Sequence, residues 1–240
     1  MSTQRTQEWT IAQKREETHD VVSLVLKAEG ERPPFIAGQY LTVMLQGFEP
    51  AEGKSYSISS TPADENITLT IKTMGNFSRA LLAKKVGDTI ITSFPYGFFY
   101  PEPDEQRNLA FVVGGIGITP CMSIIRAILA EKDGKNDPRA LTLFYSNKTA
   151  GDIVFRDDLT ALARDHKNLT VHHFITRETP TDTTLKRGRM TADTIAMTLG
   201  ERVHETDFFV CGSIQFTKSL WKDLRDVGTP STQLYTEGFF

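Results

Sequence analysis

The chain has 240 residues, of which 39% are hydrophobic and 24% charged, so its length and composition suit one large domain or two ordinary domains with apolar cores. Its net charge of −3 gives no basis for nucleic-acid binding, and the sequence lacks a signal-peptide core and the roughly 18 apolar residues of a membrane span. Two distant cysteines, Cys121 and Cys211, exclude a disulfide framework and a cysteine metal cluster, so we expect a cytoplasmic protein with neither nucleic-acid nor membrane partners.

The first hundred residues are predicted to form an all-β domain. Short segments rich in β-branched and aromatic residues alternate there with turn-forming residues. In residues 67–72 apolar and polar side chains alternate strictly, as in a strand with one face in a core. The predicted strands are residues 21–26, 40–45, 54–60, 67–72 and 89–93, with one helix at residues 77–84. This spacing favours an antiparallel barrel or sandwich.

From about Asn108 the pattern changes to alternating strands and helices. We predict strands at residues 109–113, 140–145, 169–175, 207–211 and 233–236, and helices at residues 120–131, 152–164, 191–198 and 216–226. Such alternation is typical of a doubly wound parallel sheet. The polar, proline-broken segment 101–107 separates the two patterns, so we expect domains at residues 1–104 and 105–240.

The first strand of the second domain, residues 109–113, runs into a turn that contains Gly115 and Gly117. Glycine lets the backbone bend sharply and approach a ligand closely. We expect Thr119 to cap the following helix and Pro120 to be its first residue, a helix start that binds anions. The third glycine and the acidic ribose ligand of the full dinucleotide fingerprint are absent, so an ordinary tight turn remains the alternative.

Lys54 and Tyr56 lie two residues apart in a predicted strand and therefore share one face of it. A cation beside an aromatic plane suits a cofactor with a flat ring and a pyrophosphate. The alternative is that Tyr56 packs across the sheet and Lys54 is a solvated charge.

A polar turn opens the predicted helix of the first domain and consists of Gly75, Asn76, Phe77 and Ser78. Free amides and the Ser78 hydroxyl would converge there on a position where a phosphate could bind. An ordinary helix cap is the alternative interpretation.

Taken together, these segments resemble the ferredoxin-NADP reductase family of flavoproteins over nearly the whole chain. Five short segments carry the resemblance, namely Lys54–Ser57 to its R-x-Y-S flavin motif, Gly75–Ser78 to its pyrophosphate motif, Gly114–Pro120 to its G-G-x-G-x-T-P nicotinamide loop, Cys211 and Gly212 to its C-G pair, and Glu237 with the following aromatics to its C-terminal segment. The resemblance implies a six-stranded antiparallel flavin-binding β-barrel followed by a doubly wound nucleotide-binding domain, without an iron–sulfur domain.

Two positions depart from the family pattern. Lys54 replaces the usual arginine, and an ammonium cannot reproduce the bidentate contact of a guanidinium with a pyrophosphate, so we expect a lower flavin affinity. Phe94 replaces the first glycine of the family's G-P-x-G segment. The resemblance thus implies FAD, with FMN as the less favoured flavin.

The resemblance also implies roles for individual residues. Tyr56 would stack on the flavin, Ser57 would form a hydrogen bond near its N5 atom, and Thr119 with Cys211 would hold the nicotinamide. Glu237 would contact the nicotinamide or exchange a proton. The remaining implied flavin contacts are Ile71, Lys72 and Phe240, the last covering the flavin face. Alternatively, Cys211 is an inert buried thiol, Glu237 a solvated acid, and the terminal Phe239 and Phe240 pack in the domain interface or against a partner subunit.

The choice between NADPH and NADH depends on residues that follow the second and third strands of the second domain. Ser146, Lys148, Arg177 and Arg189 together could hold a 2′-phosphate, which favours NADPH and leaves NADH open. The alternative is that Lys148 and Arg177 are ordinary surface charges.

The implied function is hydride transfer from NADPH or NADH to bound FAD, followed by delivery of single electrons to a separate carrier such as ferredoxin or flavodoxin. A plant-type iron–sulfur cluster needs four cysteines, so any cluster must belong to another chain. No metal site is expected in this chain, which we expect to be a monomer. The alternatives are an NADH-dependent reductase component of an oxygenase, a free-flavin reductase and a non-catalytic flavin- or nucleotide-binding regulatory subunit.

Overall fold

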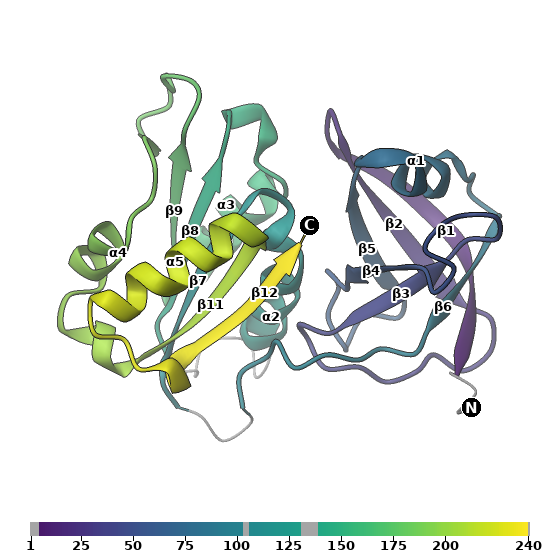
Figure 1. The fold of residues 1–240 in the computed structure, drawn as a ribbon, viewed down its shortest axis with the longest axis horizontal. Coiled ribbons are helices and arrows are strands. Elements are labelled where there is room, and N and C mark those ends of the chain that lie inside the picture. The colour runs from purple at the N-terminus through teal and green to yellow at the C-terminus, as the bar shows by residue number, and fades with distance from the viewer. Residues whose placement is uncertain (1–4, 103–105, 131–138, 240) are drawn as a thin grey trace. The chain divides into compact units, whose positions relative to one another are not determined.

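A computed structural model describes residues 5–102, 106–130 and 139–239 (Figure 1). The chain divides into two compact units, with the change between Tyr100 and Pro101. Residues Met122–Ala127, in the middle of a long helix, group with the first unit. The domain boundary predicted at residues 104 and 105 lies outside the described residues.

Within its described residues, the first unit contains a six-stranded sheet whose neighbouring strands are antiparallel, in the order β4-β3-β6-β1-β2-β5. The strands are β1 (Thr6–Thr18), β2 (Val21–Ala28), β3 (Tyr40–Met44), β4 (Lys54–Ser57), β5 (Ile67–Lys72) and β6 (Thr89–Ser93). A further bridge pairs Ile58 with Leu69, so the chain just after β4 meets β5 and closes the sheet into a barrel. The six-stranded antiparallel barrel implied by the resemblance is confirmed.

Strand β1 is the element that the strand pattern alone misses. Its second half, with the sequence QKREET, is polar and breaks the alternation on which the prediction depends. The strand is nevertheless central in the sheet, because it pairs with both β2 and β6. Trp9 and Ile11 are fully buried, and the Trp9 indole donates a hydrogen bond of 2.9 Å to Thr92 Oγ1.

The second unit contains, among its described residues, a six-stranded parallel sheet in the order β10-β9-β8-β7-β11-β12. The strands are β7 (Asn108–Gly114), β8 (Leu141–Asn147), β9 (Leu169–Ile175), β10 (Leu185–Arg187), β11 (Thr206–Ser213) and β12 (Leu234–Phe239). The helices are α2 (Ile118–Ala130), α3 (Arg156–Asp165), α4 (Ala192–Leu199) and α5 (Ile214–Asp226), joined by shorter 3-10 turns. Buried residues of α4 and α5 pack with those of β7, β8, β9 and β11 in one apolar cluster on one face of the sheet. The predicted doubly wound domain is confirmed.

Several elements of the second unit differ from their predicted bounds, and one strand was not predicted. The edge strand β10 has only three residues and gives no pattern in the sequence. Helix α3 begins at Arg156 rather than at Asp152, because the Asp152 carboxylate forms a capping box with Thr149 and Phe155 adopts a φ of 59°. Residue 131, the predicted end of α2, lies outside the described residues. Over the described part of the chain, none of the helices has the length and apolar character needed to span a bilayer.

Helix α1 (Gly75–Ala83) packs against the barrel through Phe77 and Leu81. The last turn of α1 contains no basic residue, and Lys14 of β1 supplies the positive charge at that end of the helix instead. The Lys14 ammonium donates hydrogen bonds to the main-chain oxygens of Leu82 and Lys84, at 2.5 and 2.8 Å. A cation there stabilises the free carbonyl groups at the end of a helix.

We expect Lys14→Met to lower the free energy of unfolding by about 1 to 2 kcal/mol, because the carbonyls at the end of α1 lose their cation. Urea denaturation followed by circular dichroism measures this change. The exposed Lys27 of β2 provides a matched control, and Lys27→Met should change stability by less than about 0.5 kcal/mol. Equal effects of the two substitutions would contradict a capping role for Lys14.

Candidate functional site

Strand β4 carries Lys54, the predicted cation, and Tyr56, the predicted stacking residue, and both lie against the ring of Phe77 from α1. Lys54 Nζ is 5.8 Å from the ring centroid of Phe77, and the Tyr56 ring stacks on it at 6.5 Å and 28°. Burial raises the pKa of Tyr56 to about 12, so the phenol stays protonated. The expectation that Lys54 and Tyr56 share a face is confirmed, although Phe77 itself is buried in the core and not free to contact a phosphate.

Ser57 is the residue of this strand whose buried hydroxyl group would be satisfied by a ligand. It is 3% exposed, and its Oγ has no hydrogen-bond partner among the described residues. A buried hydroxyl without a partner costs about 1 to 3 kcal/mol. A flat ring with nitrogen and oxygen acceptors beside β4 would satisfy it, so the residues present fit the flavin that the resemblance implies.

The start of α1 provides an open stretch of main chain. Gly75 has a φ of +73°, and a Cβ built on it would meet nothing within 4 Å. Met74 precedes the helix without a side-chain cap. Asn76 is exposed and accepts a hydrogen bond of 3.2 Å from Arg79. The amides of this first turn therefore remain accessible to a phosphate.

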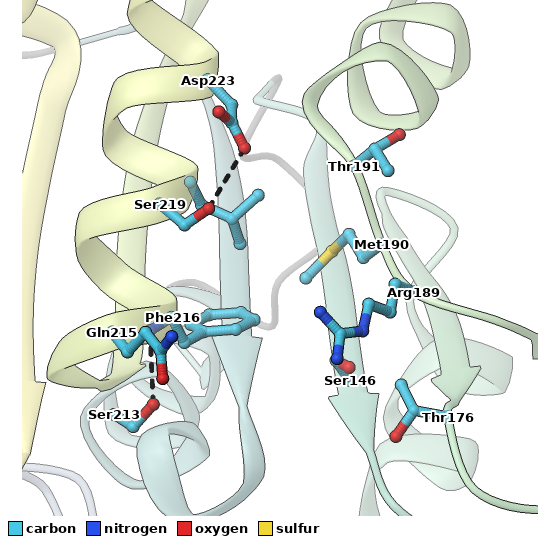
Figure 2. Close-up of a pocket in the computed structure, with 11 residues that line it drawn as sticks. Ser146, Thr176, Arg189, Met190, Thr191, Ser213, Gln215, Phe216, Ser219 and Asp223 are labelled. Carbon is cyan, nitrogen blue, oxygen red and sulfur yellow. Dashed lines mark hydrogen bonds between the residues drawn. The ribbon is translucent and has the colours of Figure 1, made fainter.

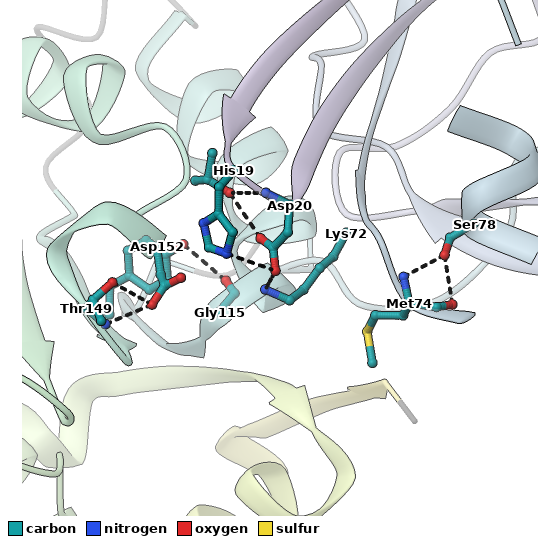
Figure 3. Close-up of polar contacts among 10 residues, drawn as sticks. His19, Asp20, Lys72, Met74, Ser78, Gly115, Thr149 and Asp152 are labelled. Carbon is teal, nitrogen blue, oxygen red and sulfur yellow. Dashed lines mark hydrogen bonds and ion pairs between the residues drawn. The ribbon is translucent and has the colours of Figure 1, made fainter. Parts of the chain in front are cut away.

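The prediction of a free Ser78 hydroxyl at this turn is wrong. Ser78 is 3% exposed, and its Oγ accepts from the Met74 amide at 2.6 Å and donates to the Met74 carbonyl at 2.7 Å (Figure 3). The side chain reaches back one helical turn and fixes the entry of the chain into α1. Ser78 thus fixes the shape of the turn, and a phosphate at this position would be bound by main-chain amides.

The end of β5 contributes one buried and one paired side chain. Ile71 is fully buried in the barrel core, so only its main chain is available to a cofactor. Lys72 Nζ is 2.6 Å from the Asp20 carboxylate at the tip of the β1–β2 hairpin (Figure 3). Burial by itself raises the pKa of Asp20, but Lys72 and His19 more than offset this and hold it below its ordinary value. Lys72 is thus held by Asp20, and a cofactor would have to compete for it.

In the second unit, β7 leads into the glycine turn η1 (Gly115–Gly117), which continues directly into α2. Gly115 has a φ of +54° with open space where a side chain would lie. A Cβ on Gly117 would lie 2.4 Å from the main-chain oxygen of Cys211, a distance that no side chain tolerates. The predicted glycine turn after the first strand is thus present, and it lies against β11.

The predicted capping roles of Thr119 and Pro120 are wrong. Helix α2 begins at Ile118, so Thr119 is its second residue and Pro120 its third. The Thr119 hydroxyl donates a hydrogen bond of 3.1 Å to the Ile116 carbonyl instead of accepting one from a helix amide. Thr119 is only 3% exposed. The reason is that η1 already supplies the first turn, so α2 needs no side-chain cap.

Cys211 and Glu237 are neighbours across two strands. The parallel register of β11 and β12 pairs Cys211 with Glu237 and Gly212 with Gly238, so the thiol and the carboxyl group share one face of the sheet. Glu237 Oε2 is buried and has no hydrogen-bond partner among the described residues, which rules out the alternative of a solvated acid. Burial raises the pKa of Glu237 from its ordinary value of 4.5 to about 7.

Both cysteines are fully buried. Burial, and then the proximity of Cys121 and Glu237, raises the pKa of Cys211 well above its ordinary value. Burial and Glu237 raise the pKa of Cys121 in the same way. Neither thiol ionises at neutral pH, so Cys211 can contribute shape to the site and not a nucleophile.

A pocket of about 490 Å³ lies beyond the ends of β8 and β9 and along α5 (Figure 2). Its walls are formed by Ser146, Thr176, Arg189, Met190, Thr191, Ser213, Gln215, Phe216, Ser219, Leu220 and Asp223. Ser146 and Arg189, both predicted nucleotide ligands, meet in this pocket. The other two predicted ligands, Lys148 and Arg177, are exposed and do not line it.

Helix α5 supplies most of the pocket residues that the sequence analysis missed. Gln215, Ser219 and Asp223 recur every four residues and therefore share one face of the helix, a spacing visible in the sequence. The Ser219 hydroxyl donates a hydrogen bond of 3.4 Å to the Asp223 carboxylate. Arg189 lies across the pocket from α5, as Figure 2 shows, so a cation and an anion occupy opposite walls. The last predicted ligand, Phe240, lies outside the described residues.

The raised pKa of Glu237 makes the stability of the second unit depend on pH. Between about pH 4.5 and 7 the folded chain keeps a proton on Glu237 that the unfolded chain has lost. The free energy of unfolding therefore falls as the pH rises through this range. Replacing Glu237 by Gln should remove this slope and stabilise the protein at pH 8 by about 1 to 3 kcal/mol.

Urea denaturation at pH 5 and pH 8 measures the slope. The exposed Glu201 provides the matched control, and Glu201→Gln should leave the slope unchanged. If Glu237→Gln left the difference between the two pH values as it is in the wild type, the carboxyl group would titrate normally.

Comparison with known proteins agrees with both halves of this arrangement. Residues 8–100 match the family model described as an oxidoreductase FAD-binding domain, and residues 111–222 match that of an oxidoreductase NAD-binding domain. Flavohemoprotein A of Dictyostelium discoideum is 28% identical over 98% of this chain and 60% of its own length. An NADH-cytochrome b5 reductase 1 of Lodderomyces elongisporus is 32% identical over 73% of this chain. The chain covers 58% of the length of that reductase, so it spans about three fifths of these two relatives.

Solved structures share the two-domain fold. The FAD/NAD-binding domain of nitric oxide dioxygenase from Vibrio cholerae has a TM-score of 0.82 at 23% identity and covers 97% of this chain, and the alignment spans 98% of that domain. A ferredoxin NADP+ reductase from Neisseria gonorrhoeae has a TM-score of 0.80 at 21% identity, with 98% and 99% of the two chains covered. The chain therefore belongs to the flavoprotein oxidoreductases that join an FAD-binding domain to an NAD-binding domain, the fold family of the ferredoxin-NADP reductases.

Proposed function

We propose that the protein accepts a hydride from NADPH or NADH on its bound FAD and passes single electrons to a carrier on a separate chain, in the cytoplasm. The observation that carries this proposal is that two of the buried polar groups without partners among the described residues belong to predicted site residues, Ser57 and Glu237. Ser57 Oγ lies in the FAD-binding domain, and Glu237 Oε2 lies beside Cys211 in the NAD-binding domain. FAD, when bound, supplies the exchange between a two-electron donor and a one-electron acceptor.

The chain's own residues orient the flavin in the first domain. The Tyr56 ring stacks on Phe77 and presents its other face to a flat ring. The Ser57 hydroxyl donates to an acceptor on that ring, which relieves the cost of its burial. The open amides around Gly75 hold the pyrophosphate, and Lys54 adds a positive charge beside them.

The second domain orients the nicotinamide nucleotide. Main-chain amides of η1 and the start of α2 bind its phosphates, because this turn has no side chain at Gly115 to block approach. The neutral Cys211 thiol and Thr119 form an apolar wall that excludes water. Glu237 holds a proton near neutral pH and can therefore donate to a carboxamide.

The names of similar proteins support a separate electron acceptor without identifying it. They include NADH-cytochrome b5 reductases and a structure titled ferredoxin reductase in carbazole 1,9a-dioxygenase, which is 24% identical with a TM-score of 0.83. We infer a one-electron protein carrier of the ferredoxin, flavodoxin or cytochrome type. The dioxygenase relative favours the second candidate function, that of a reductase component serving an oxygenase.

Purified protein should be yellow, and anaerobic addition of NADPH or NADH should bleach its flavin absorbance. Replacing Ser57 by Ala should keep flavin bound and slow this reduction about 2- to 12-fold, because a hydrogen bond between neutral groups, worth about 0.5 to 1.5 kcal/mol, is lost. Stopped-flow absorbance measures the rate. The neighbouring Ser55 is exposed and bonded to Thr42, so Ser55→Ala is the matched control and should leave the rate unchanged.

The same experiment separates the enzyme from its rivals. A colourless protein that cannot be reconstituted with FAD or FMN would favour a nucleotide-binding regulatory subunit. A protein that binds flavin loosely and releases it after reduction would favour a free-flavin reductase.

The pocket next to α5 provides a test of nucleotide choice. If Arg189 holds a 2′-phosphate, Arg189→Ala should weaken NADPH binding by about 1.5 to 3 kcal/mol and leave NADH binding unchanged. Asp223→Asn should strengthen NADPH binding, because it removes the anion from the opposite wall. Arg177, which lies outside the pocket walls, is the matched control. Equal losses of NADPH and NADH affinity in Arg189→Ala would contradict the assignment.

A further inference from the structure

Tyr145 is a fully buried residue in the middle of the second unit whose hydroxyl group serves the glycine turn. It lies in β8, paired with Val113 of β7 and His173 of β9. Its hydroxyl donates a hydrogen bond of 3.1 Å to the main-chain oxygen of Gly115, labelled in Figure 3. The hydroxyl oxygen of Tyr145 in turn accepts a hydrogen bond of 3.3 Å from the main-chain amide of Val154. Tyr145 therefore joins β8, the glycine turn and the segment that precedes α3.

The bond to Gly115 fixes one peptide plane. In a trans peptide the carbonyl of one residue and the amide N–H of the next point in opposite directions. The Gly115 carbonyl points inward to Tyr145 and to the Ile118 amide, so the Ile116 N–H points away from the protein interior. Ile116 is at the start of a helical turn, where an amide has no intrahelical partner.

The turn needs such an external constraint because of its composition. Gly115 adopts a φ of +54°, where glycine meets no steric barrier, and no atom lies within 4 Å of the position that a Cβ would take. Glycine restricts its own torsion angles less than any other residue. Without a bond to the Gly115 oxygen this peptide could rotate, and the Ile116 amide would lose its direction.

We propose that Tyr145 is a positioning residue for the nucleotide, because its hydroxyl holds the Gly115 peptide so that the Ile116 amide faces the pyrophosphate. This inference rests on the proposed nucleotide function of the glycine turn. Tyr145 itself is fully buried and does not touch the ligand. Its effect is on binding and not on the chemical step.

The test is Tyr145→Phe, which keeps the aromatic packing and removes only the hydroxyl. The probe is ADP-ribose, which carries the pyrophosphate without nicotinamide, titrated by calorimetry into FAD-saturated protein. We expect ADP-ribose affinity to fall about 3- to 10-fold, the range for a lost hydrogen bond. The KM for the nicotinamide nucleotide should rise by the same factor, while kcat and the affinity for FAD change less than twofold.

Thr206→Val is the matched control for the loss of a buried hydroxyl. Thr206 is the first residue of β11 and is fully buried, and its hydroxyl donates a hydrogen bond of 2.6 Å to the main-chain oxygen of Arg202. It pairs with Asn108, at the opposite end of the sheet from Cys211. The Thr206→Val substitution should lower the unfolding temperature without changing ADP-ribose affinity. All variants are compared at a temperature at which circular dichroism shows each to be folded.

Three outcomes would overturn the proposal. The first is unchanged ADP-ribose affinity in folded Tyr145→Phe, and the second is an equal loss in Thr206→Val. The third is a Tyr145→Phe chain that does not fold, because Tyr145 would then serve the fold as a whole. Wild-type protein that binds ADP-ribose but whose flavin no nucleotide reduces would contradict the proposed function and leave the positioning role intact.

Discussion

The close approach of Gly117 to the main chain of Cys211 is the constraint on which the nucleotide end of the site depends. A Cβ at residue 117 would lie 2.4 Å from the Cys211 oxygen and 2.8 Å from the Gly212 amide, and both are main-chain atoms that cannot move aside. Gly212 and Gly114 are in turn covered by the Phe216 ring, 2.7 and 3.3 Å from the positions of their missing side chains. Three glycines thus let the turn after β7, the end of β11 and the start of α5 come together.

This proximity determines the chemistry that the neighbouring groups can perform. Because the turn lies against β11, the Cys211 thiol and the Glu237 carboxyl group are enclosed by protein, and their charged forms lose the solvation of water. The thiol stays neutral at every ordinary pH, whereas the carboxyl group gains or loses its proton near pH 7. An enclosed site with a neutral wall and one titratable acid favours hydride transfer over nucleophilic chemistry.

Periodicity in the sequence was sufficient for most of the fold, because the strands of both units bury alternating or continuous apolar residues. The strands at residues 67–72, 89–93 and 169–175 agree with the prediction at both ends. Periodicity was insufficient where tertiary contacts, and not local sequence signals, determine an element. Strand β1 is held by its two neighbours despite its polar second half, and α2 begins without the cap expected of Thr119 because η1 precedes it.

The site was predictable to the extent that short motifs contain it. Tyr56 and Lys54 share a face by strand geometry alone, but the pairing of Cys211 with Glu237 depends on β12 lying next to β11, which no local pattern specifies. The pairing of Lys72 with Asp20 likewise depends on a hairpin tip that is distant in sequence. Motifs therefore identify the turns of such a site, and the strand order decides which side chains meet there.

Two of the buried polar atoms without partners among the described residues, Ser57 Oγ and Glu237 Oε2, support the functional interpretation on energetic grounds. Each of Ser57 Oγ and Glu237 Oε2 costs about 1 to 3 kcal/mol while it lacks a partner, against a total stability of only about 5 to 15 kcal/mol for a typical protein. An alanine or a leucine at either position would avoid that cost. A ligand that supplies an acceptor to the hydroxyl and a donor or acceptor to the carboxyl group recovers it on binding. The same energy that destabilises the free chain then contributes to the affinity and orientation of the flavin and the nicotinamide.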